Sequence, residues 1–231
     1  MNVVITGASR GIGRAITEIF AKKNNHLIIT SRSLTKQFWP HELEKNTGCH
    51  ISVFDADLSV KAEVMAFASF VKQQSDQIDV LVNNAGFFEP GSVLEEEDGV
   101  LERTLRINLY SAYHLTRALV PEMKKRKQGF IFNICSIAAL GAYPNGGSYS
   151  ISKWALLGFN NNLREELKKS GIRVTAIHPG ATLTDSWKGA GVDPKRIMEA
   201  EDIAKLIENA TTLSPQACVE EIIVRPQLGD L

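Results

Sequence analysis

Tyr149 and Lys153 have the side-chain chemistry and the spacing of a proton-transfer pair. Residues four positions apart lie on one face of a helix, with Cβ atoms about 5–6 Å apart, so the Lys153 ammonium is expected beside the Tyr149 hydroxyl. Because a nearby cation favours the phenolate, we expect Lys153 to lower the pKa of Tyr149 from its usual value of about 10. Ser136 adds a hydroxyl that can hold a substrate oxygen. Together these side chains indicate general acid and base catalysis.

A tyrosine and a lysine at this spacing also occur together on solvated helix surfaces, so the remaining motifs decide between the two interpretations. A glycine-rich segment, Gly7-x-x-x-Gly11-x-Gly13, follows an apolar run and precedes a segment with helical periodicity. Its spacing differs from the Gly-x-Gly-x-x-Gly pattern of other dinucleotide folds. The physical effect is the same, since glycines allow a tight turn and let the backbone approach a pyrophosphate at a helix N-terminus.

Further motifs occur in a fixed order along the chain. They are Thr6-Gly7-Ala8-Ser9-Arg10-Gly11-Ile12-Gly13, Asn83-Asn84-Ala85-Gly86, Asn108, the Ser136, Tyr149 and Lys153 set, and Pro179-Gly180 followed by Thr184. In this order and spacing they resemble the short-chain dehydrogenase/reductase (SDR) family, in its branch of single-domain proteins of about this length. The resemblance extends over the whole chain.

The resemblance implies a role for each of these residues. It makes Tyr149 the acid and base, Ser136 the group that hydrogen-bonds the substrate oxygen, and Lys153 a ligand of the nicotinamide ribose. Asn108 matches a family position that holds a water next to the lysine, and Asp57 matches one that binds the adenine amino group. Asp55 is left with a structural role. The implied cofactor-binding residues are Gly7, Ser9, Arg10, Gly11, Ile12, Gly13, Arg32, Asp57, Leu58, Asn83, Ala85, Gly86, Tyr149, Lys153, Pro179, Gly180, Thr182 and Thr184.

The end of the second apolar run indicates which dinucleotide binds. Folds that select NAD usually place a carboxylate there for the ribose 2′-hydroxyl, whereas a 2′-phosphate needs cations. This chain has Ser31 where the family's acid would stand, Arg32 next to it, and Arg10 in the glycine loop. We therefore expect NADP(H) as the cofactor.

Apolar runs and helical periodicity alternate along the chain. Runs typical of buried strands lie at residues 2–6, 26–31, 50–54, 78–82, 130–134, 172–177 and 220–224. Helical segments lie at 11–23, 60–74, 100–125, 149–169 and 201–211, and Pro121 predicts a kink or an early end in the third of them. The alternation predicts an α/β fold, a doubly wound parallel sheet (Rossmann fold) of about seven strands with helices on both faces. We interpret residues 1–231 as one domain with a short substrate-covering loop at about 182–197.

Composition argues against several classes of partner. The 231 residues include 26 basic and 26 acidic side chains, so no net charge attracts nucleic acid or an anionic membrane. The acidic run at 95–98 is interpreted as an exposed loop or helix start, and His178 as a strand-end residue. The spacing of cysteines and histidines predicts neither a disulfide nor a metal site. The chain opens on a strand without a signal segment, so we expect a cytoplasmic protein.

From these features we predict an NADP(H)-dependent oxidoreductase that interconverts a carbonyl and a secondary alcohol. The alternative within this class is a 3-oxoacyl-[acyl-carrier-protein] reductase. The alternative outside it is a non-catalytic dinucleotide sensor, which would not need the proton-transfer residues.

Two sets of apolar residues bear on substrate and assembly. Family position brings the first set near the site, which favours a small-molecule carbonyl or alcohol with an apolar flank. This set is Phe87, Phe88, Ile137, Leu140, Tyr143 and Trp187. The second set occupies more faces of the segment after Tyr149 than one sheet-facing stripe requires, which predicts a homodimer or homotetramer. It consists of Trp154, Ala155, Leu156, Leu157 and Phe159.

Overall fold

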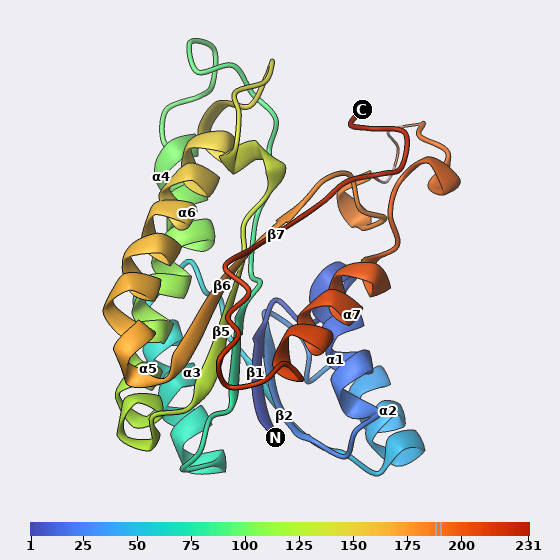
Figure 1. The fold of residues 1–231 in the computed structure, drawn as a ribbon. Coiled ribbons are helices and arrows are strands. Elements are labelled where there is room, and N and C mark those ends of the chain that lie inside the picture. The colour runs from blue at the N-terminus through green and yellow to red at the C-terminus, as the bar shows by residue number, and fades with distance from the viewer. Residues whose placement is uncertain (188, 190) are drawn as a thin grey trace.

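The computed structural model describes residues 1–187, 189 and 191–231, and these form a seven-stranded parallel sheet (Figure 1). The strand order is β3-β2-β1-β4-β5-β6-β7, so the chain runs outward from β1 in one direction and then, starting again at β4, in the other. The strands are β1 (Asn2–Thr6), β2 (His26–Ser31), β3 (His50–Asp55), β4 (Val80–Asn83), β5 (Gly129–Ile134), β6 (Ile172–Pro179) and β7 (Glu221–Val224). The predicted doubly wound α/β fold is confirmed.

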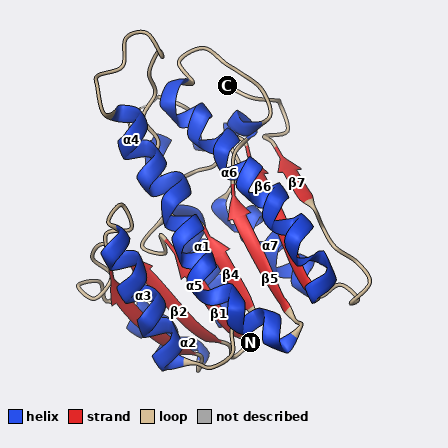
Figure 2. Cartoon of the chain, turned by 90° about the vertical axis from the view of Figure 1, so that its left-hand side faces the viewer, coloured by secondary structure: helices blue, strands red, loops and turns tan. Residues whose placement is uncertain are grey.

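Helices cover both faces of the sheet (Figure 2). The α-helices are α1 (Gly11–Ala21), α2 (Trp39–Thr47), α3 (Lys61–Gln74), α4 (Val100–Leu105), α5 (Ser111–Arg126), α6 (Gly147–Leu167) and α7 (Ala200–Thr211). Short helical turns are η1 (Arg106–Tyr110), η2 (Ile137–Ala139), η3 (Lys168–Ser170), η4 (Asp185–Trp187) and η5 (Pro194–Arg196). Among the described residues, none of the helices combines the length and the apolar character that a membrane crossing requires.

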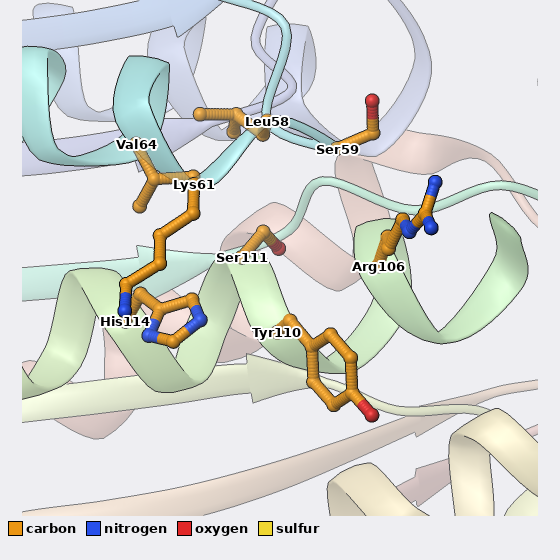
Figure 3. Close-up of a pocket in the computed structure, with 8 residues that line it drawn as sticks. All are labelled: Leu58, Ser59, Lys61, Val64, Arg106, Tyr110, Ser111 and His114. Carbon is orange, nitrogen blue, oxygen red and sulfur yellow. The ribbon is translucent and has the colours of Figure 1, made fainter. Parts of the chain in front are cut away.

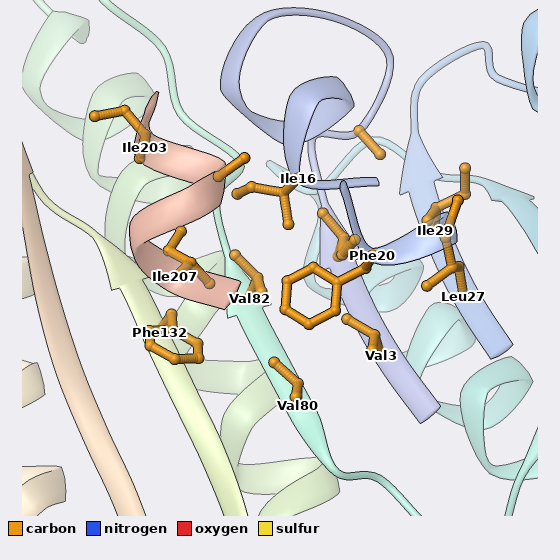
Figure 4. Close-up of a cluster of buried hydrophobic side chains, with 14 of the residues drawn as sticks. Val3, Ile16, Phe20, Leu27, Ile29, Val80, Val82, Phe132, Ile203 and Ile207 are labelled. Atoms are coloured by element: carbon orange, nitrogen blue, oxygen red, sulfur yellow. The ribbon is translucent and has the colours of Figure 1, made fainter. Parts of the chain in front are cut away.

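Side chains alternate between the two faces of each strand. Val3 and Ile5 of β1 pack on one face with Phe20 of α1 and Ile207 of α7 (Figure 4). Val4 packs on the other face with residues of α3 and α5. Because both faces are buried, the strands are continuous apolar runs, which explains why the sequence identified them.

Two features of the helices differ from the prediction. The helix α2 was not predicted, although a proline at its start and Gly48 after its end are ordinary helix signals. The segment predicted as one helix at 100–125 is α4, the π-helical turn η1 and α5, and it continues past Pro121 to Arg126. Pro121 and Arg117 are both exposed, so the carbonyl that loses its hydrogen bond faces solvent and the helix does not end early.

The predicted covering loop at about 182–197 contains the turns η4 and η5. An isolated bridge between Thr182 and Met198 closes its two ends. Lys188 and Ala190, which belong to this predicted loop, lie outside the described residues.

Candidate active site

The glycine loop after β1 is a tight turn. Gly7 has a φ of +66°, and a Cβ atom on Gly13 would lie 2.3 Å from the Gly7 carbonyl oxygen. Asn84 closes the turn from the neighbouring strand, because its Nδ2 donates to the carbonyls of Thr6 (2.8 Å) and Gly7 (3.1 Å). No side chain caps the first turn of α1, whose N-cap is Arg10. This end of α1 therefore offers backbone N–H groups to an anion.

Tyr149 and Lys153 lie on the first turns of α6, close to the end of β5. Lys153 Nζ is 5.7 Å from the centroid of the Tyr149 ring and donates to the Ile134 carbonyl at 2.8 Å. The Ser136 side chain lies close enough to the Tyr149 hydroxyl to act on its pKa. Lys153 is buried, and this desolvation lowers its pKa to about 8.

The prediction that Lys153 lowers the pKa of Tyr149 is wrong for this structure. Burial raises the pKa of Tyr149 to about 12 and outweighs the hydrogen bond from Ser136, which acts in the opposite direction. The ammonium is directed to the Ile134 carbonyl rather than to the phenol oxygen. Tyr149 is therefore protonated at neutral pH, which is the form that donates a proton.

Ser136 is fixed from two sides. Its hydroxyl accepts a hydrogen bond from the Ala138 N–H at 3.1 Å, and its carbonyl lies 3.0 Å from Nδ1 of His178. Because a carbonyl only accepts, Nδ1 of His178 carries the proton. His178 stands near the end of β6 and is fully buried, so it is a strand-end residue that also orients the loop of Ser136.

Asn108 lies in the π-helical turn η1 and joins two segments of the site. Its Oδ1 accepts from the Phe87 N–H at 2.7 Å, and its Nδ2 donates to the Phe87 carbonyl (3.0 Å) and to Ser152 Oγ (2.8 Å). A Cβ atom on Gly86 would lie 3.6 Å from both Asn108 Oδ1 and Lys153 Nζ. Asn108 is thus beside Lys153, and its amide group donates hydrogen bonds to Phe87 and Ser152.

The residues assigned to the adenosine end surround the ends of β2 and β3. Asp57 accepts from the N–H (2.9 Å) and hydroxyl (2.7 Å) of Ser59; these bonds lower its pKa, and nearby Arg32 adds to the effect. Asp55 accepts from the backbone N–H and hydroxyl of Thr35, in agreement with a structural role. Arg32 is exposed.

Arg10 is not free in this structure. Its guanidinium forms an ion pair with Asp185 of the covering loop at 2.8 Å. The loop also approaches the glycine turn at Thr184, whose Cγ2 would lie 3.0 Å from a Cβ atom on Gly11. The glycine loop and the covering loop are therefore in contact.

Asn83 connects β4 to the elements beside it. It is buried, and its Nδ2 donates to Thr116 Oγ1 (3.0 Å) and Asn133 Oδ1 (2.8 Å), so its side chain ties β4 to α5 and β5. Asn133 in turn donates a hydrogen bond from Nδ2 to Oδ1 of Asn160 in α6. The Oδ1 atom of Asn83 is buried and has no hydrogen-bond partner among the described residues. Of the remaining predicted residues, the structure brings to the same edge Ser9, Ile12, Leu58, Ala85, Pro179, Gly180 and Thr182.

Sequence reasoning missed three residues that shape the site. Asn84 holds the glycine turn, His178 holds Ser136, and Glu96 accepts from the backbone N–H of Ser148 at 2.9 Å. Asn84 belongs to the Asn83-Asn84-Ala85-Gly86 motif, so its position in the sequence could have identified it as a site residue. The other two contacts join residues 42 and 52 positions apart, which no local pattern predicts.

A surface pocket of about 320 Å³ lies beside the adenosine end (Figure 3). Its lining includes Lys61, Arg106 and His114, and the Lys61 charge helps to lower the pKa of His114, after desolvation. In Figure 3 Lys61 lies next to His114, whereas the Arg106 guanidinium points to the opposite side. The cations do not converge on one position, so we assign no ligand to this pocket.

A doubly wound parallel sheet with a glycine turn after its first strand, and with polar side chains gathered at the carboxyl ends of its strands, defines a dinucleotide-fold α/β protein. Residues 1–194 match the family described as short chain dehydrogenase. The chain belongs to the short-chain dehydrogenase/reductase family of oxidoreductases.

Two relatives align with most of the chain. Sepiapterin reductase of Chlorobaculum tepidum is 34% identical over 245 residues, which span 99% of this chain and 97% of that protein. A 3-oxoacyl-[acyl-carrier-protein] reductase of Haemophilus influenzae is 31% identical and is covered to 87%, with 88% of this chain. Both similarities are therefore far longer than the glycine loop alone.

Solved structures give the same result. An alcohol dehydrogenase of Thermococcus sibiricus, complexed with 5-hydroxy-NADP, superposes with a TM-score of 0.89 at 26% identity over 98% of this chain and 96% of that chain. L-sorbose reductase of Gluconobacter frateurii, complexed with NADPH and L-sorbose, has a TM-score of 0.89 at 28% identity over 96% and 94%.

Proposed function

We propose that this protein is an NADP(H)-dependent oxidoreductase that interconverts a carbonyl and a secondary alcohol. The observation that carries the proposal is that the Ser136 and Tyr149 hydroxyls lie together beside the buried Lys153. A dinucleotide sensor would have no use for this arrangement. The reductase and dehydrogenase names of the similar proteins support the same reaction class.

The glycine turn fits a dinucleotide. Gly7 and Gly13 stand where a Cβ atom would collide with the neighbouring backbone and with Asn84, so only glycine permits this turn. The start of α1 has no side-chain cap, and its free backbone N–H groups suit a pyrophosphate. Lys153 and the backbone around Gly86 would hold the nicotinamide end, and Asp57 with Leu58 the adenine end. When bound, the cofactor supplies a hydride in reduction and accepts one in oxidation.

Proton transfer falls to the chain's own side chains. In reduction, Tyr149 donates its proton to the oxygen of the carbonyl, and Ser136 hydrogen-bonds that oxygen. The high pKa of Tyr149 keeps the proton available at neutral pH. Lys153, whose Nζ is 5.7 Å from the centroid of the Tyr149 ring, is left to hold the nicotinamide ribose, and solvent returns a proton to the phenolate that remains.

A screen of carbonyl compounds with NADPH oxidation as the readout tests the proposed function. It should include sepiapterin, L-sorbose and a 3-oxoacyl thioester, because similar proteins carry these reductase names. Phe88 contacts the Tyr149 ring edge-on, with centroids 4.8 Å apart, so compounds with an apolar flank should react fastest and phosphorylated sugars poorly. NADPH binding without oxidation by any carbonyl compound would favour the sensor.

NADPH is expected to bind more tightly than NADH, because Arg32 is an exposed cation and no acid stands at Ser31. Arg32→Asp should reduce this preference at least about tenfold, since a hydrogen bond to a charged group contributes about 1.5–3 kcal/mol. The measurement is fluorescence titration with both cofactors. Lys72→Asp, at an exposed position of α3, controls for the change in net charge. Equal affinities in the unmutated protein would contradict the proposal.

The protein is expected to form a dimer or tetramer through α5 and α6. Tyr113 and Trp154 are 37% and 49% exposed, and a groove of about 500 Å³ runs between Leu109, Phe159 and their neighbours. A Cβ atom on Gly158 in this groove meets nothing within 4 Å, so Gly158→Lys should leave the subunit folded and block association. Light scattering at micromolar concentration measures both proteins. A monomeric unmutated protein would contradict this prediction.

A further inference from the structure

The segment between Gly86 and α4 is fastened to the start of α6 by the carboxylate of Glu96. One carboxylate oxygen accepts the Ser148 backbone N–H at 2.9 Å, and the other accepts the Ser148 hydroxyl. The Gly91 N–H adds a bond to the Asn145 carbonyl at 3.1 Å. The acidic run at 95–98 was predicted to be exposed, and this is wrong for Glu96, which is partly buried against the almost fully buried Ser148.

The chain leaves room for this carboxylate at two glycines. A Cβ atom on Gly147, where φ is +38°, would lie 2.0 Å from a Glu96 carboxylate oxygen. A Cβ atom on Gly91 would lie 2.6 Å from Glu96 Cγ. Side chains at either position would push Glu96 away from Ser148, so the contact depends on three separate parts of the sequence.

Glu96 acts as a cap that comes from a distant segment. Ser148 is the second residue of α6, and no side chain of the N-cap residue, Gly146, bonds the first turn. The N–H groups of a first turn lack partners within the helix and carry a partial positive charge. A carboxylate that accepts one of them fixes where the helix begins.

The next residue after Ser148 is Tyr149, and the same segment reaches Tyr149 a second time. The Phe88 ring contacts the Tyr149 ring edge-on, while Asn108 holds the backbone of Phe87 at both its N–H and its carbonyl. The segment is thus attached at Ser148, which precedes Tyr149, and at Phe87, which precedes the Phe88 ring in contact with Tyr149. We infer that Glu96 is a positioning residue for proton transfer, which holds the start of α6 so that the Tyr149 hydroxyl meets the substrate oxygen. This inference rests on the proposed function.

Glu96→Ala is expected to lower kcat about 10- to 100-fold, because a small misplacement of a catalytic group is costly. The Kd for NADPH should stay unchanged, since the contacts of Glu96 are with Ser148 and not with any residue assigned to the cofactor. Glu96→Gln should recover most of kcat, as its amide can accept from the Ser148 N–H and donate to the Ser148 hydroxyl. Glu95→Ala and Glu97→Ala, at exposed neighbouring positions, are matched controls that should behave like the unmutated protein.

Ser148→Ala keeps the backbone bond and loses the hydroxyl bond, so its kcat should fall less than that of Glu96→Ala. Ser148→Ala also tests the role of Glu96 if Glu96→Ala does not fold. An unchanged kcat for Ser148→Ala would then overturn the inference. Tyr149→Phe is measured in the same assay. If Tyr149→Phe is inactive and Glu96→Ala has full kcat, the proposed function stands and this inference fails. If Tyr149→Phe keeps full kcat, both fail.

Discussion

Replacing Tyr149 with Phe should lower turnover about 10²- to 10⁴-fold, the usual effect of losing a general acid. The change removes only the hydroxyl. The ring that packs against Phe88 remains, so the fold and NADPH binding should survive. Steady-state kinetics with the best carbonyl substrate and NADPH titration of the same preparation make the measurement.

Tyr110→Phe is the matched control, because it removes the same hydroxyl from an exposed tyrosine of η1. Its turnover should equal that of the unmutated protein. Undiminished turnover in Tyr149→Phe would mean that another group delivers the proton, and the assigned mechanism would be wrong.

Replacing Lys153 with Met should impair both cofactor binding and turnover. If the ammonium holds the nicotinamide ribose, its loss removes a hydrogen bond to a charged group, which is worth about 1.5–3 kcal/mol and corresponds to a roughly 10- to 100-fold weaker Kd for NADPH. Turnover should also fall, because a nicotinamide that is no longer held at its ribose is misplaced for hydride transfer. A Lys153→Met protein with unchanged Kd for NADPH and unchanged kcat would show that Lys153 has no role in cofactor binding or catalysis.

The pH dependence follows from the lowered pKa of Lys153, which is about 8. The side chain is protonated below that pH and loses its charge as the pH rises through it. In the unmutated protein kcat/KM for reduction should therefore decline above about pH 8. Lys153→Met should show no inflection there. An identical inflection in both proteins would assign it to another group.

The stability of Lys153→Met supplies a control. A buried lysine with a lowered pKa holds its proton less well in the folded than in the unfolded chain, so below about pH 8 its charge costs stability. As the pH rises from about 8 to 10.5, that cost disappears. At pH 7 the variant, which is apolar and of similar length, should unfold at the same or a higher temperature. A lower activity then cannot be attributed to unfolding.

The strands and the glycine turn could be predicted because their causes are local. A strand buried on both faces is a continuous apolar run, as at Val3, Val4 and Ile5, and a turn such as that at Gly7 requires a positive φ. Helix α2 was accessible by the same means, since its proline and Gly48 are sequence signals.

The electrostatics of the site could not be predicted from spacing. The distance of four residues between Tyr149 and Lys153 says that the two are neighbours, but burial decides the direction of both pKa shifts. Burial depends on how α6 packs against the sheet and on the segment that Glu96 fastens over it. The role of Glu96 likewise depends on a contact with Ser148, 52 residues away.

Hydride transfer between the nicotinamide and a carbonyl carbon is tested most directly with NADPH that carries deuterium at both C4 positions of the nicotinamide, together with the best substrate from the carbonyl screen. We expect the product to be an alcohol that carries the deuterium on its carbinol carbon, with transfer at least about 10²-fold slower in Tyr149→Phe. Bound NADPH that transfers no deuterium to any carbonyl compound would contradict the account.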